Sequence, residues 1–534
     1  MPGSGKTTAG SLLARLLRVP FADMDDLFEQ EHGMAPAEYL RGHGEAAFRD
    51  KEAETFERAL SIPDRVVACG GGTLVRPRSL AAALKRSTVV YLSARVETLA
   101  ARLGDASRHP LLSGARLDVA LVNLLEKRQA GYRAAHAAVA TDGLGPVAVA
   151  LAVRESLRGL GVGPWTEPLS PVFGRVGRGL EAFVEMGLRS YPVRLSLQPG
   201  LSGLAAFLDV VAAGRRCVVV ADRTAALRHA AALKLELHAS GRRLVLLPAG
   251  ELAKDVRRLP AVVKAMARAG LDRTGVVVAV GGGSALDAAG FAASVYMRGV
   301  PAVYVPTTLL AALDACVGGK TALDVPGGKN LIGSITQPLG VFVPVGVVGL
   351  EVRERKSPDG VAEHLKTCLL SGNTEEIGRL ARPWKLPQDA LAAVIARCLE
   401  YKIRVVAADE REQDGQRTVL NLGHTFAHAL EAASGYRLAH GRAVGAGLVL
   451  AAQASVRLGV AEPALASDVE RWARSLGLYP LEPRLDLGAA SRLIASDKKR
   501  VGRGIRLVLL ERPGCPLVRT VPLKVAEYLM ATEP

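Results

Sequence analysis

Two histidines spaced four residues apart carry the clearest chemistry in the chain. The segment Asn421–Glu431 contains His424 and His428. Residues at this spacing share one face of a helix, so their imidazoles can point into one cavity. A third histidine, His440, follows, and a carboxylate, Glu363, lies upstream; such a set can form a catalytic zinc site. The pair alone is equally typical of two hydrogen-bonded histidines on a half-buried helix face.

The chain opens with a second chemical pattern, Met-Pro-Gly-Ser-Gly-Lys-Thr-Thr. This is the latter part of a phosphate-binding loop, whose backbone amides cradle phosphates at the start of a helix, here Thr7–Leu17. In such a loop Lys6 reaches the outer phosphates and Thr7 holds Mg²⁺. The expected nucleotide-binding residues are Gly3, Ser4, Gly5, Lys6, Thr7 and Thr8.

Short apolar runs rich in β-branched residues follow in the middle of the chain. These runs predict buried parallel strands that alternate with helices, which implies a doubly wound nucleotide-binding domain. The loop Gly281–Asp287 follows one of them and opens a helix, where a pyrophosphate would sit. The expected strands are Cys217–Ala221, Arg243–Leu247, Val276–Val280 and Ala302–Val305.

Composition limits the class of protein. A chain of 534 residues needs several cores, and 49% apolar with 22% charged residues is typical of a soluble protein. No apolar run reaches the ~18 residues of a membrane span, and no signal-peptide pattern opens the chain. The six cysteines are scattered, which favours a cytoplasmic protein without disulfides.

The net charge of +16 raises the possibility of nucleic-acid binding. However, the basic residues are dispersed, only 4% of residues are aromatic, and no nucleic-acid motif occurs. A basic balance also suits an enzyme with phosphate and carboxylate substrates. We therefore expect small-molecule partners, with no nucleic acid and no membrane.

The segments Asn421–Glu431, Gly281–Asp287 and Pro306–Gly333 together resemble 3-dehydroquinate synthase, an enzyme of the shikimate pathway, from about Tyr191 to the C-terminus. The resemblance implies NAD and a Zn²⁺ or Co²⁺ ion held by Glu363, His424 and His440. The implied catalytic residues are Asp314, Lys320, Lys366, Lys402, Arg417, Asn421, His428 and Lys498. The implied NAD-binding residues are Asp222, Glu251, Lys254, Gly281, Gly282, Gly283, Asp287, Thr307, Thr308, Lys329 and Asn330.

Three further positions matter for this resemblance. Arg298 matches the family's phosphate-binding arginine, which is contributed across a dimer interface, so we expect a homodimer through this half. Leu286 replaces a glycine of the family in the glycine loop, and Arg442 replaces a glutamate beside a metal ligand. We expect these two replacements to crowd the loop and to disturb the surroundings of the metal.

The segments Phe21–Asp25, Gly44–Arg49 and Val66–Gly72 resemble shikimate kinase in order and spacing, over about Met1–Leu160. The resemblance implies ATP with Mg²⁺, and shikimate bound by Asp25, Arg49, Gly70, Gly71, Gly72 and Arg133. It places Asp23 near the metal and the attacking hydroxyl, and Arg102 near the adenine. The family has a lid arginine where this chain has His109, so we expect Arg108, one residue earlier, near ATP.

The strand and the first glycine of the phosphate-binding loop would precede Met1. In the kinase fold this strand is central, and its loss would leave the backbone groups of its neighbours unpaired. We therefore expect a true start upstream, and little shikimate phosphorylation by the chain as written.

The resemblances imply a bifunctional enzyme that makes 3-dehydroquinate from a heptulosonate 7-phosphate and phosphorylates shikimate. The alternatives are another sugar-phosphate cyclase, or an NAD-dependent polyol dehydrogenase with a non-catalytic phosphate-loop module. Arg417, which grips a carboxylate in the synthase family, favours a carboxylated substrate. The remaining alternative is a basic scaffold or nucleic-acid-binding protein without either enzymatic activity.

The expected fold class is α/β throughout. Residues 1–160 form a kinase-like parallel sheet that lacks its first strand, and 161–190 form a linker with a short helix near Gly179–Glu185. Residues 191–348 form the NAD-binding domain, and 349–534 a mostly helical domain for metal and substrate.

Overall fold

The computed structural model describes residues 1–534 except 18, 104–115, 163–172, 185, 187–188, 213, 232, 234–242, 327, 356–357, 482–485, 495–499, 502–503 and 532–534. The chain forms two compact units. The first comprises Met1–Pro168, Glu185–Tyr191 and Leu208–Gly214, and the second Leu169–Val184, Pro192–Phe207 and Arg215–Pro534. In the described part of the chain, none of the helices has both the length and the apolar character needed to cross a bilayer.

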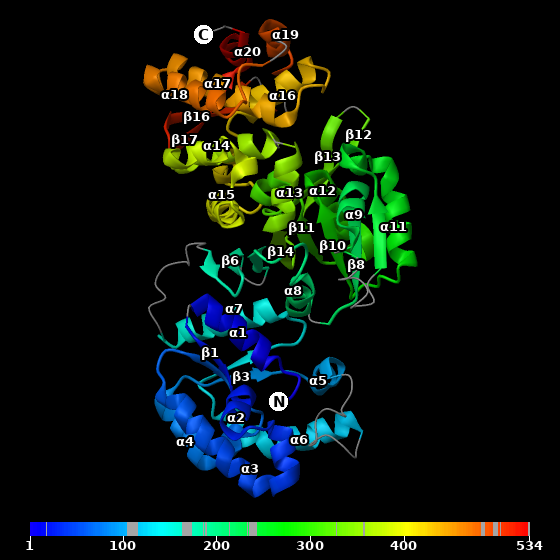
Figure 1. Ribbon diagram of the computed structural model, residues 1–534, viewed down its shortest axis with the longest axis vertical. Helices are drawn as coiled ribbons and strands as arrows, with labels where there is room; N and C mark the ends of the chain where they lie inside the picture. Colours follow the sequence, from blue (N-terminus) through cyan, green and yellow to red (C-terminus); the bar gives the residue numbers. More distant parts are fainter. Residues whose placement is uncertain are drawn as a thin grey trace. The chain divides into compact units, whose positions relative to one another are not determined.

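The first unit holds two parallel strand pairs among its described residues. Strand β1 (Phe21–Asp23) pairs with β2 (Val66–Ala68), and β3 (Val90–Ser93) with β4 (Ala137–Ala140). Its helices are α1 (Lys6–Leu17), α2 (Met24–His32), α3 (Pro36–Ser61), α4 (Pro77–Arg86), α5 (Val96–Leu103), α6 (Leu117–Arg133) and α7 (Pro146–Gly159), drawn in blue and cyan in Figure 1. Helix α1 packs on β1, β2 and α7, so the phosphate-binding loop that precedes it is fixed at the end of these elements.

Local sequence explains how these helices begin and bend. The side chain of Asp23 caps α2 by accepting from the amide of Asp25, and Gly33 ends that helix in the left-handed region at φ 72°. Helix α3 bends at Gly44, whose φ of 79° favours glycine. The bend lets the second half of α3 carry Arg49 toward the loop after β2.

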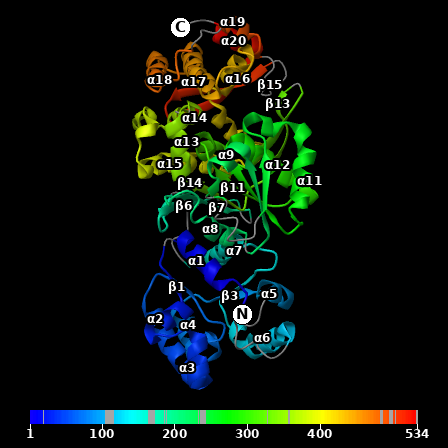
Figure 2. The ribbon, with the colours of Figure 1, turned by 45° about the vertical axis from the view of Figure 1, so that its right-hand side comes forward.

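The second unit contains an eight-stranded sheet in the order β5-β6-β7-β14-β11-β10-β8-β9. Its strands are β5 (Gly174–Arg175), β6 (Gly179–Val184), β7 (Tyr191–Ser196), β8 (Cys217–Asp222), β9 (Arg243–Leu247), β10 (Val276–Gly281), β11 (Ala302–Pro306) and β14 (Gly340–Pro344). The neighbours from β7 to β9 pair in parallel, as expected for a doubly wound domain. Helices α9 (Arg223–Arg228), α11 (Leu259–Arg268) and α12 (Gly283–Val295) pack on these strands (Figure 2). The four strands predicted from the sequence are confirmed.

The helix expected near Gly179–Glu185 is wrong, because Gly179–Val184 is strand β6 of the same sheet. The expected linker 161–190 is also too long, since β5 and β6 belong to this sheet. A Cβ at Gly179 would lie 2.4 Å from the carbonyl oxygen of Leu195, on β7. Glycine therefore allows the two strands to approach each other, and pairing with β7 outweighs the weak helical pattern.

The rest of the second unit is mainly helical. It follows a β-hairpin of β12 (Lys320–Val325) and β13 (Gly328–Ile335). The helices are α13 (Val345–Arg355), α14 (Pro358–Ser371), α15 (Gln388–Ala408), α16 (His424–Ala433), α17 (His440–Arg457), α18 (Pro463–Ser475), α19 (Leu487–Ser491) and α20 (Leu523–Ala531). An antiparallel sheet of β15 (Arg500–Val501), β16 (Gly504–Arg512) and β17 (Cys515–Pro522), which the sequence did not predict, packs on α17. Figures 1 and 2 both show α17 between α16 and α18, and α17 also packs on β16.

Candidate active sites

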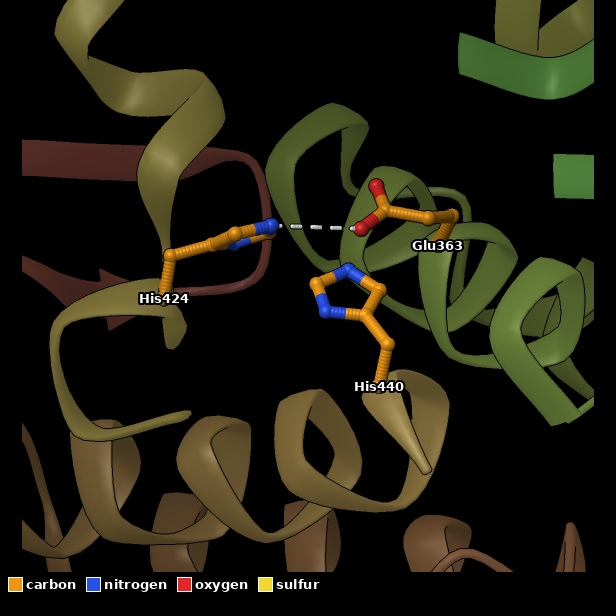
Figure 3. Close-up of side chains that lie close together, drawn as sticks. All are labelled: Glu363, His424 and His440. Carbon is orange, nitrogen blue, oxygen red and sulfur yellow. Dashed lines mark ion pairs between the residues drawn. The ribbon is translucent and has the colours of Figure 1, made fainter. Parts of the chain in front are cut away.

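Three helices of the second unit bring Glu363, His424 and His440 together (Figure 3). One ligand atom from each lies within 4.8 Å of the others. The Nε2 atom of His424 is 3.4 Å from a carboxylate oxygen of Glu363. Two imidazoles and one carboxylate fit a Zn²⁺ or Co²⁺ ion and leave a further position open for substrate.

Close backbone approaches place these ligands. A Cβ at Gly441 would lie 2.3 Å from the carbonyl of Pro358, so only glycine lets the start of α17 reach the start of α14. The amide of Gly441 donates to the carboxylate of Asp359 at 2.6 Å, which fixes this contact. Similarly, a Cβ at Gly447 would lie 2.3 Å from the carbonyl oxygen of Gly423, where α17 crosses the start of α16. All three ligand-bearing helices therefore meet at glycine contacts.

The charges around the cluster suit a cation. Burial alone would raise the pKa of Glu363, but Lys366, with which it forms an ion pair, and His424 outweigh burial and hold that pKa well below its usual range. Burial, reinforced by Lys366, lowers the pKa of His424 to about 4. At neutral pH the carboxylate is ionised and the His424 imidazole is neutral, as metal ligands must be.

A second carboxylate, Glu431, supports the cluster, and the sequence reading did not single it out. Its Oε1 atom lies 2.9 Å from Nδ1 of His440. The helical spacing could have found it, because Glu431 lies seven residues after His424 and shares its face of α16. The ring of His428, also on this helix, meets that of His424 edge-on at 5.8 Å.

Buried Lys402 and half-buried Asp314 form a second ion pair in the same unit. The Nζ atom of Lys402 is 2.7 Å from the carboxylate of Asp314 and donates to its backbone carbonyl at 2.5 Å. Asp314 lies in a π-helical turn, Ala311–Ala315, a conformation frequent at functional sites. Burial lowers the pKa of Lys402, with Asp314 opposing this shift. The charges of Asp314 and Lys366 also interact, so this pair belongs to the surroundings of Glu363.

The residues expected to bind the substrate contact hydrogen-bond acceptors of the protein itself. The guanidinium of buried Arg417 donates to the carbonyls of Glu410 at 2.7 Å and Gly318 at 2.8 Å. Lys320 forms an ion pair with Glu412, whose other carboxylate oxygen is 3.5 Å from the amide of Asn421. The sequence reading missed Glu412, because no local pattern shows which cation a loop carboxylate will meet.

The expected NAD-binding residues gather around the start of α12. A Cβ at Gly281 would lie 2.5 Å from the carboxylate of Asp222, so only glycine fits there. Ser284 donates to Glu251 at 2.5 Å, and Thr307 donates its amide to the carbonyl of Gly281 at 2.9 Å. In the same region, Lys254 pairs with Asp287 at 2.7 Å and lies beside Asn330. Lys329 is 3.5 Å from Glu251, and Thr308 lies next to Gly282. A Cβ at Gly283 would meet Ala315 of the π-helical turn at 3.5 Å.

The two departures from the synthase pattern are accommodated. Leu286 is buried within α12 at 1% exposure, so its side chain packs in the core. Arg442 donates to the carbonyl of Pro480 at 2.8 Å. Crowding of the loop by Leu286 therefore stays a prediction.

In the first unit, the phosphate-binding loop and Asp23 come together. Thr7 donates to the carboxylate of Asp23 at 2.7 Å, as suits two groups near one Mg²⁺ ion. Lys6 donates to the carbonyl of Met1 at 2.8 Å, so its amine lies over the loop. Arg102 lies 3.5 Å from the carbonyl of Gly3, and donates to the hydroxyl of Thr141 at 3.0 Å.

The expected shikimate-binding residues also converge. A Cβ at Gly72 would lie 2.5 Å from the guanidinium of Arg49, and one at Gly70 would lie 3.7 Å from the carboxylate of Asp25. Arg49 is held by Glu52 at 2.6 Å. Burial, with the nearby Asp23 and Glu52 carboxylates, raises the pKa of Asp25.

The structure places a different arginine from the expected Arg133 beside the Gly70–Gly72 turn. Arg133 is exposed at the end of α6, whereas Arg128 is 6% exposed and lies 2.6 Å from the position of a Cβ on Gly71. Residues five apart point in different directions on a helix. Arg128 lies seven residues after the fully buried Leu121 and therefore shares its inward face, which is the signal that the motif match overlooked.

Two expected site residues fall outside the described residues. Arg108, together with His109, belongs to residues 104–115, and Lys498 belongs to residues 495–499. Arg298 is described and is exposed at the end of the turn Tyr296–Arg298, with φ 68°.

Comparison with known families decides the assignment of both units. A family model for shikimate kinase matches residues 2–158. Models for the N-terminal and C-terminal parts of 3-dehydroquinate synthase match residues 244–356 and 360–500. The chain is a shikimate kinase fused to a 3-dehydroquinate synthase. The predicted fusion, α/β fold and pair of shikimate-pathway activities are thereby confirmed.

Solved structures agree with the fold of the synthase half. It is similar to 2-deoxy-scyllo-inosose synthase, with 22% identity, a TM-score of 0.57, and coverage of 64% of this chain and 96% of that one. It is also similar to 2-epi-5-epi-valiolone synthase from Streptomyces hygroscopicus subsp. jinggangensis 5008, with 25% identity, a TM-score of 0.54, and coverage of 64% and 95%. The kinase half matches shikimate kinase from Aquifex aeolicus VF5 at 32% identity over 30% of this chain and 94% of that one, with a TM-score of 0.28.

Proposed function

We propose that the synthase half converts a heptulosonate 7-phosphate into 3-dehydroquinate and phosphate, using NAD⁺ and a Zn²⁺ or Co²⁺ ion. The observation that carries this proposal is the convergence of Glu363, His424 and His440 within 4.8 Å. The related inosose synthase structure contains NAD⁺ and Co²⁺, and the valiolone synthase structure contains NAD⁺ and Zn²⁺, which supports both cofactors here.

When bound, NAD⁺ would accept and return a hydride, and the metal ion would act as a Lewis acid on substrate oxygens. Glu363, His424 and His440 would hold the ion, and the Gly281–Gly283 loop at the start of α12 would hold the pyrophosphate of NAD⁺. We assign proton transfer to His428, because its ring borders that of His424 and imidazole exchanges protons near neutral pH.

We further propose that Lys320, Asn421 and Arg417 bind the anionic groups of the substrate. Glu412 is the acceptor that Lys320 and Asn421 contact in the substrate-free protein. A substrate carboxylate or phosphate would replace it, since these groups take the same charge-assisted hydrogen bonds. Lys366 and Lys402, paired with Glu363 and Asp314, would add positive charge beside the reacting oxygens.

For the kinase half, we propose transfer of phosphate from ATP to shikimate at a measurable rate, in place of the weak activity expected from the sequence, because Lys6, Thr7 and Asp23 come together at the phosphate-binding loop. Thr7 and Asp23 would hold Mg²⁺ between them, and Lys6 would contact the outer phosphates. Asp25, Arg49, Arg128 and the Gly70–Gly72 turn would bind shikimate, with the two guanidinium groups suited to its carboxylate.

We also propose that the protein is a cytoplasmic homodimer through its synthase half. Its domain boundaries would lie between α7 and β5, because β5 and β6 belong to the sheet of the second unit, and near residue 348. Arg298 is exposed beside Val295 (44%) and Met297 (46%), and such an exposed apolar surface around a charged residue supports a partner copy. All six cysteines are free, which suits a reducing compartment. Light scattering of the purified protein tests the dimer. The role of Arg298 is tested separately, since an Arg298→Ala variant that remains dimeric should lose synthase activity.

The synthase assignment is tested by replacing His424 with Ala. We expect bound metal and phosphate release to fall together, while the kinase half still phosphorylates shikimate at the wild-type rate. Metal content by elemental analysis, phosphate release and NADH absorbance are measured on the same samples. Wild-type protein that accumulates NADH without releasing phosphate would instead indicate a polyol dehydrogenase, and full phosphate release by metal-free His424→Ala would refute the metal site.

A further inference from the structure

We propose that Glu431 is a positioning residue for the metal centre, which holds the proton of His440 on Nδ1 and so leaves Nε2 as the ligand atom. This inference rests on the proposed metal site and extends it to a residue beyond the three ligands.

The geometry of His440 carries the inference. Its Nδ1 atom is 2.9 Å from a carboxylate oxygen of Glu431. Figure 3 shows that one ring nitrogen of His440 faces Glu363 and the other is turned away from it. Since Nδ1 is engaged by Glu431, the nitrogen that faces Glu363 is Nε2. The two nitrogens of this ring are therefore assigned to different partners.

The chemistry of imidazole determines which nitrogen of His440 carries the proton and which can bind a metal. A neutral imidazole carries one N–H, and its other nitrogen offers the lone pair that a metal needs. An ionised carboxylate can only accept a hydrogen bond, so it holds the N–H on the nitrogen beside it. A metal-binding histidine commonly donates its second N–H to a carboxylate, which fixes the tautomer and the ring orientation.

Helix α16 strengthens the case, because it carries both His424 and Glu431 on one face. The Glu431 side chain is only 15% exposed, so water competes weakly for His440. One helix thus supplies a ligand directly and orients another ligand on α17. The main competing reading is an ion pair that merely joins α16 to α17 and has no effect on the metal.

The test measures Zn²⁺ affinity of the full-length protein by competition with a chromogenic chelator. We expect Glu431→Ala to weaken Zn²⁺ binding by about 10- to 100-fold. Glu431→Gln should also weaken it, because the amide can donate to Nδ1 and move the imidazole proton to Nε2. Glu431→Asp should recover part of the affinity, since it restores an acceptor.

Glu470→Ala is the matched control, because Glu470 is a carboxylate of the same unit that pairs with Arg474 on α18. It should bind Zn²⁺ like the wild type. Circular dichroism checks folding, and if Glu431→Ala does not fold, the isosteric Glu431→Gln variant decides the question.

The visible absorption of the Co²⁺-loaded protein gives a second readout. Glu431→Gln should shift or weaken the ligand-field bands, and Glu470→Ala should not, whereas a purely structural ion pair would leave them unchanged in both. Wild-type Zn²⁺ affinity in Glu431→Gln with unchanged Co²⁺ bands overturns this inference alone. A wild-type protein that binds no Zn²⁺ overturns the proposed metal site and this inference with it.

Discussion

At the scale of single residues, several candidate site side chains among the described residues are held by charged neighbours. Glu52 holds Arg49 in the kinase half, and Glu431 contacts His440 in the synthase half. Charge-assisted contacts of this kind fix both position and protonation before substrate arrives.

The kinase half offers a direct test of one such position. We expect Arg128→Ala to lower kcat/KM for shikimate by about 10- to 100-fold, because a hydrogen bond to a charged group contributes about 1.5–3 kcal/mol. Arg133→Ala removes the same charge from the exposed end of the same helix and should change kcat/KM less than about twofold. Steady-state kinetics with varied shikimate compare the two, and equal losses would contradict the placement of Arg128.

The sequence predicted the residues that belong to compact motifs, including the three members of the metal cluster and the Gly70–Gly72 turn. It did not predict Glu431, Glu412 or Arg128 as site residues. Their contacts depend on how helices and loops pack, which motif spacing does not encode.

At the scale of elements, the metal cluster depends on how closely α14, α16 and α17 approach one another. The strands β8, β9, β10 and β11 were predictable because buried parallel strands read as continuous β-branched runs. Strand β6 was not, because it lies near the sheet edge, where pairing with a neighbour outweighs its own pattern. The glycine contacts between helices could not be predicted either, since the sequence around a helical glycine does not show which neighbouring backbone it contacts.

Gly441 provides the element-scale prediction. In Gly441→Ala the new Cβ would stand 2.3 Å from the carbonyl of Pro358, so α17 must shift away from α14. We expect this to lower the free energy of unfolding of the synthase half by about 1–3 kcal/mol and to weaken Zn²⁺ binding. Gly378→Ala is the control, because a Cβ there meets nothing within 4 Å. Urea unfolding and chelator competition provide the measurements, and wild-type values for Gly441→Ala would show that the helices tolerate the shift.

At the scale of the whole molecule, the chain divides into two compact units, and each contains the residues expected for one activity. The phosphate-binding loop and the shikimate-binding residues all lie in the first unit, and the metal cluster and glycine loop lie in the second.

We therefore expect each activity to be removable without the other. Lys6→Ala should abolish shikimate phosphorylation, because the amine over the phosphates is lost, and should leave dehydroquinate formation within about twofold of the wild type. His424→Ala should produce the converse result. Both rates are measured on each purified variant, and a loss of both activities in either folded variant would show that the units depend on each other.

The metal cluster also has a consequence for how the chain unfolds. Its three ligands lie roughly 60 and 16 residues apart in the sequence, so a bound ion would close two loops as covalent cross-links do. The six cysteines are free, and the ion would take the place that disulfides hold in other proteins. At a Zn²⁺ concentration about 1,000-fold above Kd, this linkage adds about 4 kcal/mol to the unfolding free energy of the synthase half alone. In calorimetry, a chelator should therefore lower one melting transition and leave the kinase transition in place, and the chelator should have no effect on His424→Ala.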